Sequence, residues 1–316
     1  MRIMSRSRLP LLLLLLLAWG TAGAAVPKVV ASIAPVHSLV SGVMAGVGRP
    51  ALLLKGYTSP HTYQLRPSDA SALANAGVVF WVGEGLESFL AGALGRLAPQ
   101  ARHLALMEAP GMTLLEARSG GLLEPDEASS GHGHGHGHGA HGLDPHVWLS
   151  PANAEAMVEA VAALLAEVDP ANAAAYRRNA GELKGRLQEL DRALAALLEP
   201  VADRRYLVFH DAYQYLEHRY GLQAAGTITA SPARMPGARR LSALRDLVEG
   251  KEVRCVFSET QIDSPLVQTL VEGTGVRVAE LDPLGSTRGA PPDRYFEMMR
   301  RNGQAIAECL AGAGGD

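Results

Sequence analysis

Two spacings of apolar residues alternate along most of the chain. Short apolar runs bounded by turn residues predict strands, and apolar positions three or four apart predict helices. Strands are predicted over residues 28–32, 51–54, 78–82, 103–106, 206–209, 223–228, 253–257 and 276–280. Helices are predicted over residues 35–46, 70–76, 84–97, 151–168, 171–199, 212–220, 238–249, 265–272 and 293–310. This order is typical of an α/β fold with mainly parallel sheets flanked by helices.

The longest helical pattern divides the chain into two parts. Leucines recur every three or four residues from Leu183 to Leu198, between Pro170 and Pro200. A helix of this length crosses a whole molecule, so we predict two lobes joined by a long backbone helix. The predicted parts are an N-terminal lobe over residues 25–168, a connecting helix over residues 169–200 and a C-terminal lobe over residues 201–316.

The first 24 residues are typical of a secretory signal peptide. Three arginines precede the apolar run Leu11–Ala18, and the small residues Ala22–Ala24 follow it, so we expect cleavage near Ala24. An uncleaved anchor is the alternative, but the apolar run is about half of what spans a bilayer. Export makes one disulfide between Cys255 and Cys309 plausible, with two buried thiols as the alternative.

Histidine is abundant, whereas cysteine is scarce. The 316 residues include 11 His and 2 Cys, and the formal charge of −3 leaves no electrostatic footprint for nucleic acid. Residues 124–142 carry glycine at nearly every second place and predict a mobile loop. This loop is either a weak, auxiliary metal-binding arm or a solvated insertion with incidental affinity. Its histidines are His132, His134, His136, His138 and His141.

Five other side chains share one structural context. His61 lies in the loop after strand 51–54, His210 ends strand 206–209, and Glu259 and Asp282 follow strands 253–257 and 276–280. Ligands of open α/β sheets bind beyond the carboxyl ends of the strands, so these side chains can converge on one cleft. His146, directly after the histidine-rich loop, can reach the same cleft.

The donor set favours zinc. Three imidazoles and one carboxylate oxygen suit tetrahedral Zn²⁺ better than Mg²⁺ or Ca²⁺. We expect Asp282 to be the fourth ligand and Glu259 to accept a hydrogen bond from an imidazole N–H. The histidines expected to be structural or surface residues are His37, His103 and His218.

Six short motifs, in this order, resemble a known family. They include His61-x-Tyr63-x-x-x-Pro67-Ser68-Asp69, Asp144-Pro145-His146-Val147-Trp148-Leu149, His210-Asp211-Ala212-Tyr213, Cys255-Val256-Phe257-Ser258-Glu259 and Leu281-Asp282-Pro283-Leu284-Gly285. Together they resemble the zinc-binding members of the metal-specific periplasmic solute-binding proteins of ABC transporters, often called ZnuA, within the cluster A-I metal-binding family.

The resemblance implies a non-enzymatic zinc carrier in the periplasm. Its expected partners are an ABC permease in the inner membrane and a periplasmic zinc chaperone, and we expect a monomer. It implies His61, His146 and His210 as ligands, with Asp282 or water in the fourth position. Because manganese-binding relatives carry a carboxylate where His210 stands, this residue indicates zinc. The two cysteines match a disulfide of zinc-binding members that would pin the last helix to the second sheet.

Three other functions compete with zinc transport. A zinc-dependent hydrolase could use a water bound by the three imidazoles, with Glu259 as general base. No His-Glu-x-x-His motif accompanies the ligands, which disfavours this function. The others are a manganese- or iron-binding member of the same family, and an adhesin or zinc buffer.

Overall fold

The computed structural model describes residues 26–56, 58–118, 121–123, 142–229, 236–260, 265–285 and 290–312. The predicted signal peptide and the glycine-histidine tract with its five histidines lie outside the described residues. Among the helices that are described, none has both the length and the apolar character needed to cross a membrane.

The first sheet has four parallel strands in the order β2-β1-β3-β4. The central strands β1 and β3 are apolar on both faces, as expected where helices cover both sides of a sheet. The strands are β1 (Val29–Ala31), β2 (Ala51–Leu52), β3 (Val78–Trp81) and β4 (Arg102–Ala105). The helices of this half are α1 (Ala34–Val43), α2 (Pro67–Ala74) and α3 (Ser88–Leu97).

The second sheet repeats this arrangement, with four parallel strands in the order β6-β5-β7-β8. The strands are β5 (Arg205–His210), β6 (Gln223–Thr229), β7 (Cys255–Glu259) and β8 (Arg277–Leu281). The helices are α6 (Gln214–Tyr220), α7 (Ala238–Glu249), α8 (Pro265–Val271) and α9 (Arg294–Ala311). The predicted α/β class with two mainly parallel sheets is therefore confirmed.

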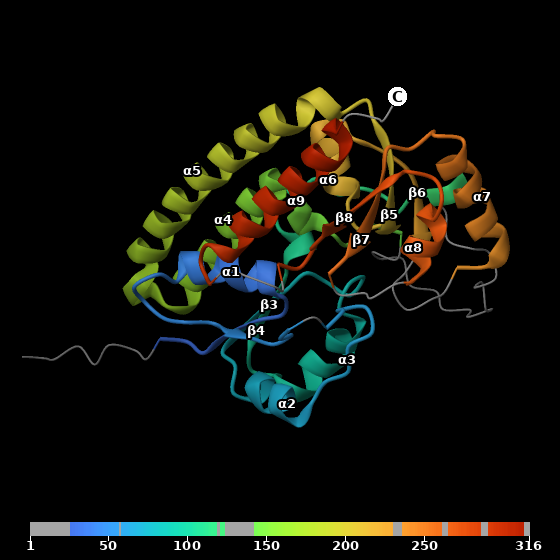
Figure 1. The fold of residues 1–316 in the computed structure, drawn as a ribbon. Helices are drawn as coiled ribbons and strands as arrows, with labels where there is room; N and C mark the ends of the chain where they lie inside the picture. The colour runs from blue at the N-terminus through green and yellow to red at the C-terminus, as the bar shows by residue number, and fades with distance from the viewer. Residues whose placement is uncertain are drawn as a thin grey trace, which may run out of the picture.

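The long helix α5 (Ala173–Leu198) connects the two halves. Its 26 residues extend about 39 Å. Along this length α5 contacts α4 (Pro151–Val168), α1, α9 and α6, and it lies along the outer edge of the molecule in Figure 1. The predicted leucine stripe from Leu183 to Leu198 is buried against these helices, so the helix braces both sheets. The exact lobe boundaries stay a prediction.

Several predicted element boundaries differ from those in the structure. The helix predicted over 84–97 begins at Ser88, because the carboxylate of Glu87 accepts the backbone N–H groups of Val82 and Gly83 at 2.9 and 3.0 Å and holds a turn. The helix predicted over 70–76 is α2 (Pro67–Ala74), because Asp69, its third residue, accepts the backbone N–H of Arg66 and closes the first turn. The strand predicted over 253–257 is β7 (Cys255–Glu259), so Glu259 ends the strand instead of following it.

The predicted disulfide is confirmed. Cys255 at the start of β7 is bonded to Cys309 in the last turns of α9. Both residues are buried. The bond therefore fixes the last helix to the second sheet.

Candidate metal site

Three imidazoles meet between the two halves of the molecule. The Nε2 atom of His146 lies 3.2 Å from Nε2 of His61 and 3.4 Å from Nε2 of His210. The three histidines each offer a ring nitrogen, and these nitrogens all lie within 4.8 Å of one another. His61 comes from the loop between β2 and α2, His210 ends β5, and His146 precedes the short helical turn Val147–Leu149.

The spacing of these nitrogens suits a small tetrahedral ion. Zn–N bonds of about 2.0–2.1 Å place ligand atoms about 3.3–3.4 Å apart at the corners of a tetrahedron. The two Nε2 separations from His146, 3.2 and 3.4 Å, are close to this edge length. Three imidazole nitrogens at this spacing are a donor set for a borderline cation.

His210 is oriented by Glu259. The Nδ1–H group of His210 donates to Oε1 of Glu259 over 2.5 Å, which leaves Nε2 facing the other imidazoles. The Glu259 residue is 3 % exposed. Burial lowers the pKa of His210, but the Glu259 carboxylate and its hydrogen bond outweigh burial, so this pKa is raised. The contact is the one expected of Glu259 from the sequence: a buried carboxylate that fixes the tautomer of an imidazole.

His146 has an equivalent partner that the sequence reasoning missed. Oδ1 of Asp144 accepts both the ring Nδ1–H of His146 at 2.7 Å and its backbone N–H at 2.9 Å. Asp144 is 4 % exposed, and burial raises its pKa to about 7. The signal was present as Asp-Pro-His, because aspartate hydrogen-bonds its own backbone two residues on.

His61 differs from the other two histidines. It is half-buried, and among the described residues its side chain has one hydrogen-bond contact, the one to His146. Burial, and then the neighbouring His146 and His210, lower its pKa well below the usual value. Burial and His210 likewise lower the pKa of His146 to about 3. At neutral pH these two rings are therefore neutral and present lone pairs.

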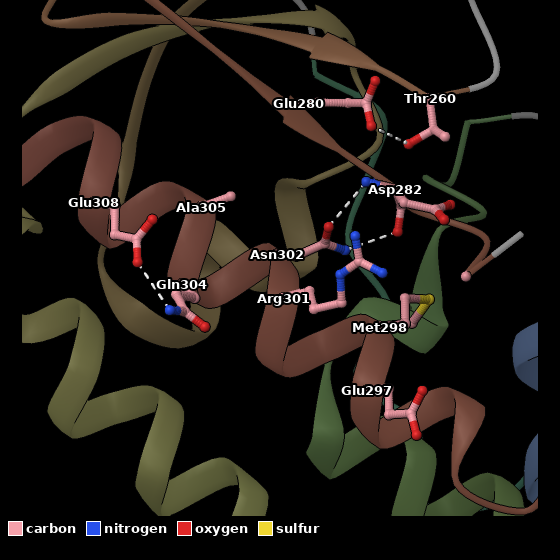
Figure 2. A pocket seen from close by; sticks show the side chains of 11 residues that line it. Thr260, Glu280, Asp282, Glu297, Met298, Arg301, Asn302, Gln304, Ala305 and Glu308 are labelled. Atoms are coloured by element: carbon pink, nitrogen blue, oxygen red, sulfur yellow. Dashed lines mark hydrogen bonds between the residues drawn. The ribbon is translucent and has the colours of Figure 1, made fainter. Parts of the chain in front are cut away.

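Asp282 is not brought into this group. Its carboxylate is outside the set of ligand atoms within 4.8 Å of one another, and its Oδ1 accepts the backbone N–H of Leu284 at 3.1 Å. Figure 2 shows how α9 holds the backbone of Asp282: Asn302 accepts its N–H at 2.9 Å and donates to its C=O at 2.8 Å. Asp282 thus begins a fixed turn directly after β8, on the wall of a surface pocket.

A partly buried ion-pair network involves Asp211, the residue after His210, and the sequence reasoning missed it as well. Arg118 donates to both carboxylate oxygens of Asp211 and, at 2.5 Å, to Glu217. The other oxygen of Glu217 accepts the hydroxyl of Tyr206 at 3.0 Å. These contacts join residues up to 99 positions apart, so no local spacing could have indicated them.

The remaining described histidines lie outside the cluster. Nε2 of His37 and Nε2 of His103 contact the backbone carbonyls of Pro50 and Ala98 at 3.0 and 2.8 Å. His218 is exposed in the last turn of α6. The structural or surface role expected for these three is consistent with these positions.

Two parallel sheets braced by one long helix, with three imidazoles gathered between them, define a metal-binding solute-binding protein. Over residues 29–309 the chain matches the family described as "Zinc-uptake complex component A periplasmic" (ZnuA). The chain belongs to this family.

Relatives of known name and structure agree with this assignment. A Brucella suis protein named "High-affinity zinc uptake system protein ZnuA" is 41% identical over 305 residues, covering 90% of this chain and 91% of the relative. A solved ZnuA with residues 138–173 deleted and zinc bound superposes with a TM-score of 0.75 at 25% identity, covering 91% of this chain and 99% of that one. The solute-binding protein FpvC of Pseudomonas aeruginosa, solved with Mn²⁺, gives 0.77 at 25% identity, covering 92% and 100%. These relatives are named as binding and uptake components, not as enzymes.

Proposed function

We propose that this protein captures Zn²⁺ in the periplasm and delivers it to the permease of an ABC transporter. The observation that carries the proposal is the convergence of three Nε2 atoms at the spacing of a tetrahedral ion. His61, His146 and His210 are the proposed ligands. The zinc-uptake names of the relatives support zinc as the cargo.

The state of the imidazoles supports tight capture. A metal ligand must present a lone pair, so a protonated imidazole has to lose a proton before it binds. His61 and His146 have lowered pKa values and need no such loss at neutral pH. Glu259 in turn increases the basicity of the ligand nitrogen of His210, and Asp144 fixes the tautomer of His146.

The fourth position of the tetrahedron goes to Asp282 or to water. We propose Asp282, because its turn is fixed by Asn302 at the carboxyl end of β8, the same end of the second sheet at which His210 lies. A carboxylate there would reduce the charge of the bound dication. Replacement of Asp282 by Asn would then weaken zinc binding, whereas a water ligand would leave it unchanged.

Delivery requires the site to open. We propose that the lobes over residues 25–168 and 201–316 rock about the connecting helix over residues 169–200 when the permease binds. The packing of α5 against α1 and α9 favours a small rotation over wide hinge closure. The chain is proposed to act as a monomer and without enzymatic activity.

The test is a competitive titration of Zn²⁺ against Mn²⁺ on the metal-free protein, with the metal content measured by mass spectrometry. We expect about one tightly bound zinc for the His61–His146–His210 site. Single replacement of each of these three histidines by Ala should abolish tight binding. His218→Ala is the matched control, because His218 is an exposed histidine in the same half of the molecule as His210.

Two results would contradict the proposal. Tighter binding of Mn²⁺ than of Zn²⁺ would favour a manganese carrier instead. Turnover of an ester or peptide substrate by the zinc-loaded protein, lost in His210→Ala, would favour a zinc hydrolase.

A test in cells addresses delivery. Zinc uptake should fail in cells that lack this chain and return when it is restored.

A further inference from the structure

A short two-stranded ribbon lies beside His146. We use this name for residues 115–117 together with residues 142–144. The backbone N–H of Ala117 donates to the carbonyl of Gly142 at 2.6 Å, and that of Asp144 donates to the carbonyl of Leu115 at 2.9 Å. The pairing is antiparallel. The ribbon therefore ends at the residue whose carboxylate orients His146.

One hydroxyl from the second half of the molecule joins both strands of the ribbon. Tyr215 in α6 accepts the backbone N–H of Leu115 at 3.0 Å and donates to the carbonyl of Asp144 at 2.8 Å. This residue is 2 % exposed. Its neighbour Gln214 adds a second contact, from Nε2 to the carbonyl of Glu116 at 3.1 Å. Two residues of helix α6 therefore hold the backbone of the ribbon in place.

Asp144 is fixed at three points as a result. Leu115 binds its N–H, Tyr215 binds its C=O, and its carboxylate binds the ring and the backbone of His146. An oriented ligand requires an oriented partner, because an error in the partner is passed to the imidazole. The position of the His146 ring therefore depends on the Tyr215 hydroxyl through Asp144.

The same stretch of chain also carries another ligand. His210 ends β5, and α6 begins four positions later at Gln214. The segment 210–215 consequently supplies one imidazole directly and holds a second through one hydroxyl. This arrangement ties a ligand that precedes α5 to a ligand that follows it, without any metal.

We propose that Tyr215 is a positioning residue of the zinc site, which holds His146 in register with His210 by fixing Asp144. The inference rests on the zinc-binding function proposed above. Its chemical basis is a buried hydroxyl that both donates and accepts. Phenylalanine at this position would remove this partner from the part-buried N–H of Leu115 and from the buried C=O of Asp144.

The test compares Tyr215→Phe with Tyr176→Phe. Tyr176 is a matched control, because it is fully buried and its hydroxyl donates to Asp169 at 2.8 Å, away from the three histidines. Zinc affinity is measured by competition with a chelator, and site geometry by the visible absorption of the Co²⁺-loaded protein. We expect Tyr215→Phe to raise the Kd for zinc by about three- to tenfold, somewhat less than loss of a direct ligand partner, and to alter the Co²⁺ spectrum. Tyr176→Phe should change neither.

A double-mutant cycle tests the route through Asp144. In an Asp144→Ala background, Tyr215→Phe should change the Kd by less than about twofold. The proposal is overturned if the two losses multiply, if Tyr215→Phe binds zinc like the wild type, or if Tyr176→Phe weakens binding equally. If Tyr215→Phe does not fold, Gln214→Ala removes a milder contact of the same ribbon. It should raise the Kd by a smaller factor, and an unchanged Kd would then count against the proposal.

Failure of the underlying function gives a different result. If the wild-type chain binds no zinc tightly, or if His146→Ala binds it as well as the wild type, the three-histidine site itself is wrong and the role of Tyr215 falls with it. Loss of binding in His146→Ala with no effect of Tyr215→Phe would refute the positioning role alone.

Discussion

Removal of the Glu259 carboxylate should weaken zinc binding without removing a ligand. Two replacements separate charge from geometry. In Glu259→Gln the amide oxygen can still accept the Nδ1–H of His210, but the negative charge is lost. In Glu259→Ala the acceptor is lost as well, and a buried N–H is left without a partner. Both variants retain the three imidazoles.

The structure sets the size of the expected effect. The bond from His210 to Glu259 is 2.5 Å long, buried and charge-assisted, and such bonds contribute about 1.5–3 kcal/mol. Loss of such a partner typically lowers metal affinity by about 10- to 100-fold, which is about 1.4–2.8 kcal/mol. We expect a loss of zinc affinity of about 10-fold for Glu259→Gln and of about 100-fold for Glu259→Ala.

The effect should also depend on pH in a defined direction. Because Glu259 raises the pKa of His210, protons compete with zinc for His210 at a higher pH in the wild type than in Glu259→Gln. As the pH falls through the wild-type pKa, the wild type loses affinity first. The Kd of Glu259→Gln divided by the Kd of the wild type is therefore largest at high pH and decreases as the pH falls.

Chelator-competition titrations between pH 5.5 and 8.5, on protein shown to be folded by circular dichroism, measure both effects. Glu280→Gln is the control, since Glu280 is an exposed carboxylate on the neighbouring strand β8. The reasoning would be refuted by a Kd for Glu259→Ala within twofold of the wild type, or by an equal loss in Glu280→Gln.

Three further outcomes are expected. Burial raises the pKa of Glu87 to about 7 despite its bonds from Ser32, Gly83 and Val82, so its protonated form is favoured in the fold. The free energy of unfolding should therefore fall by about 3 kcal/mol between pH 4.5 and 7.5 relative to Glu87→Gln, as measured by urea titrations at each pH. Replacement of Cys255 and Cys309 by Ser opens a closed loop of 54 residues and should lower the free energy of unfolding by about 4 kcal/mol in the same assay. Among the histidine variants, His61→Ala should retain more residual zinc affinity by calorimetry than His146→Ala, because His146 contacts both other ligands.

Much of the fold could be predicted because its signals are local. The apolar run Val78–Val82 indicates a strand buried on both faces, and β3 occupies such a position in the first sheet. Parallel sheets place the carboxyl ends of their strands together, which was enough to nominate His61 and His210. The predicted contact of Glu259 with an imidazole followed from the same rule.

The rest depends on pairs of residues far apart in the chain. Tyr215 meets Asp144 across 71 positions, and Arg118 meets Asp211 across 93. The sequence around a tyrosine or an arginine in a helix or loop does not predict a hydrogen-bond partner so far away in the chain. The turn held by Glu87 was missed for a different reason: its side chain replaces backbone hydrogen bonds that helical periodicity assumes. Elements and candidate ligands with local signals could therefore be predicted from the sequence. The hydrogen bonds that hold the ligands could be identified only from the structure.

The unequal support of the three ligands bears on how a carrier can bind tightly and still release its cargo. His146 and His210 are each backed by a buried carboxylate and are tied together through Tyr215. His61 stands in a loop with no such partner among the described residues. A pair held in place before the metal arrives costs little entropy on binding, while a third ligand on a loop can leave first at little cost. In the proposed small rotation of the lobes, His61 would then be the first ligand to leave, because the contacts of Tyr215 with Leu115 and Asp144 would keep His146 near His210.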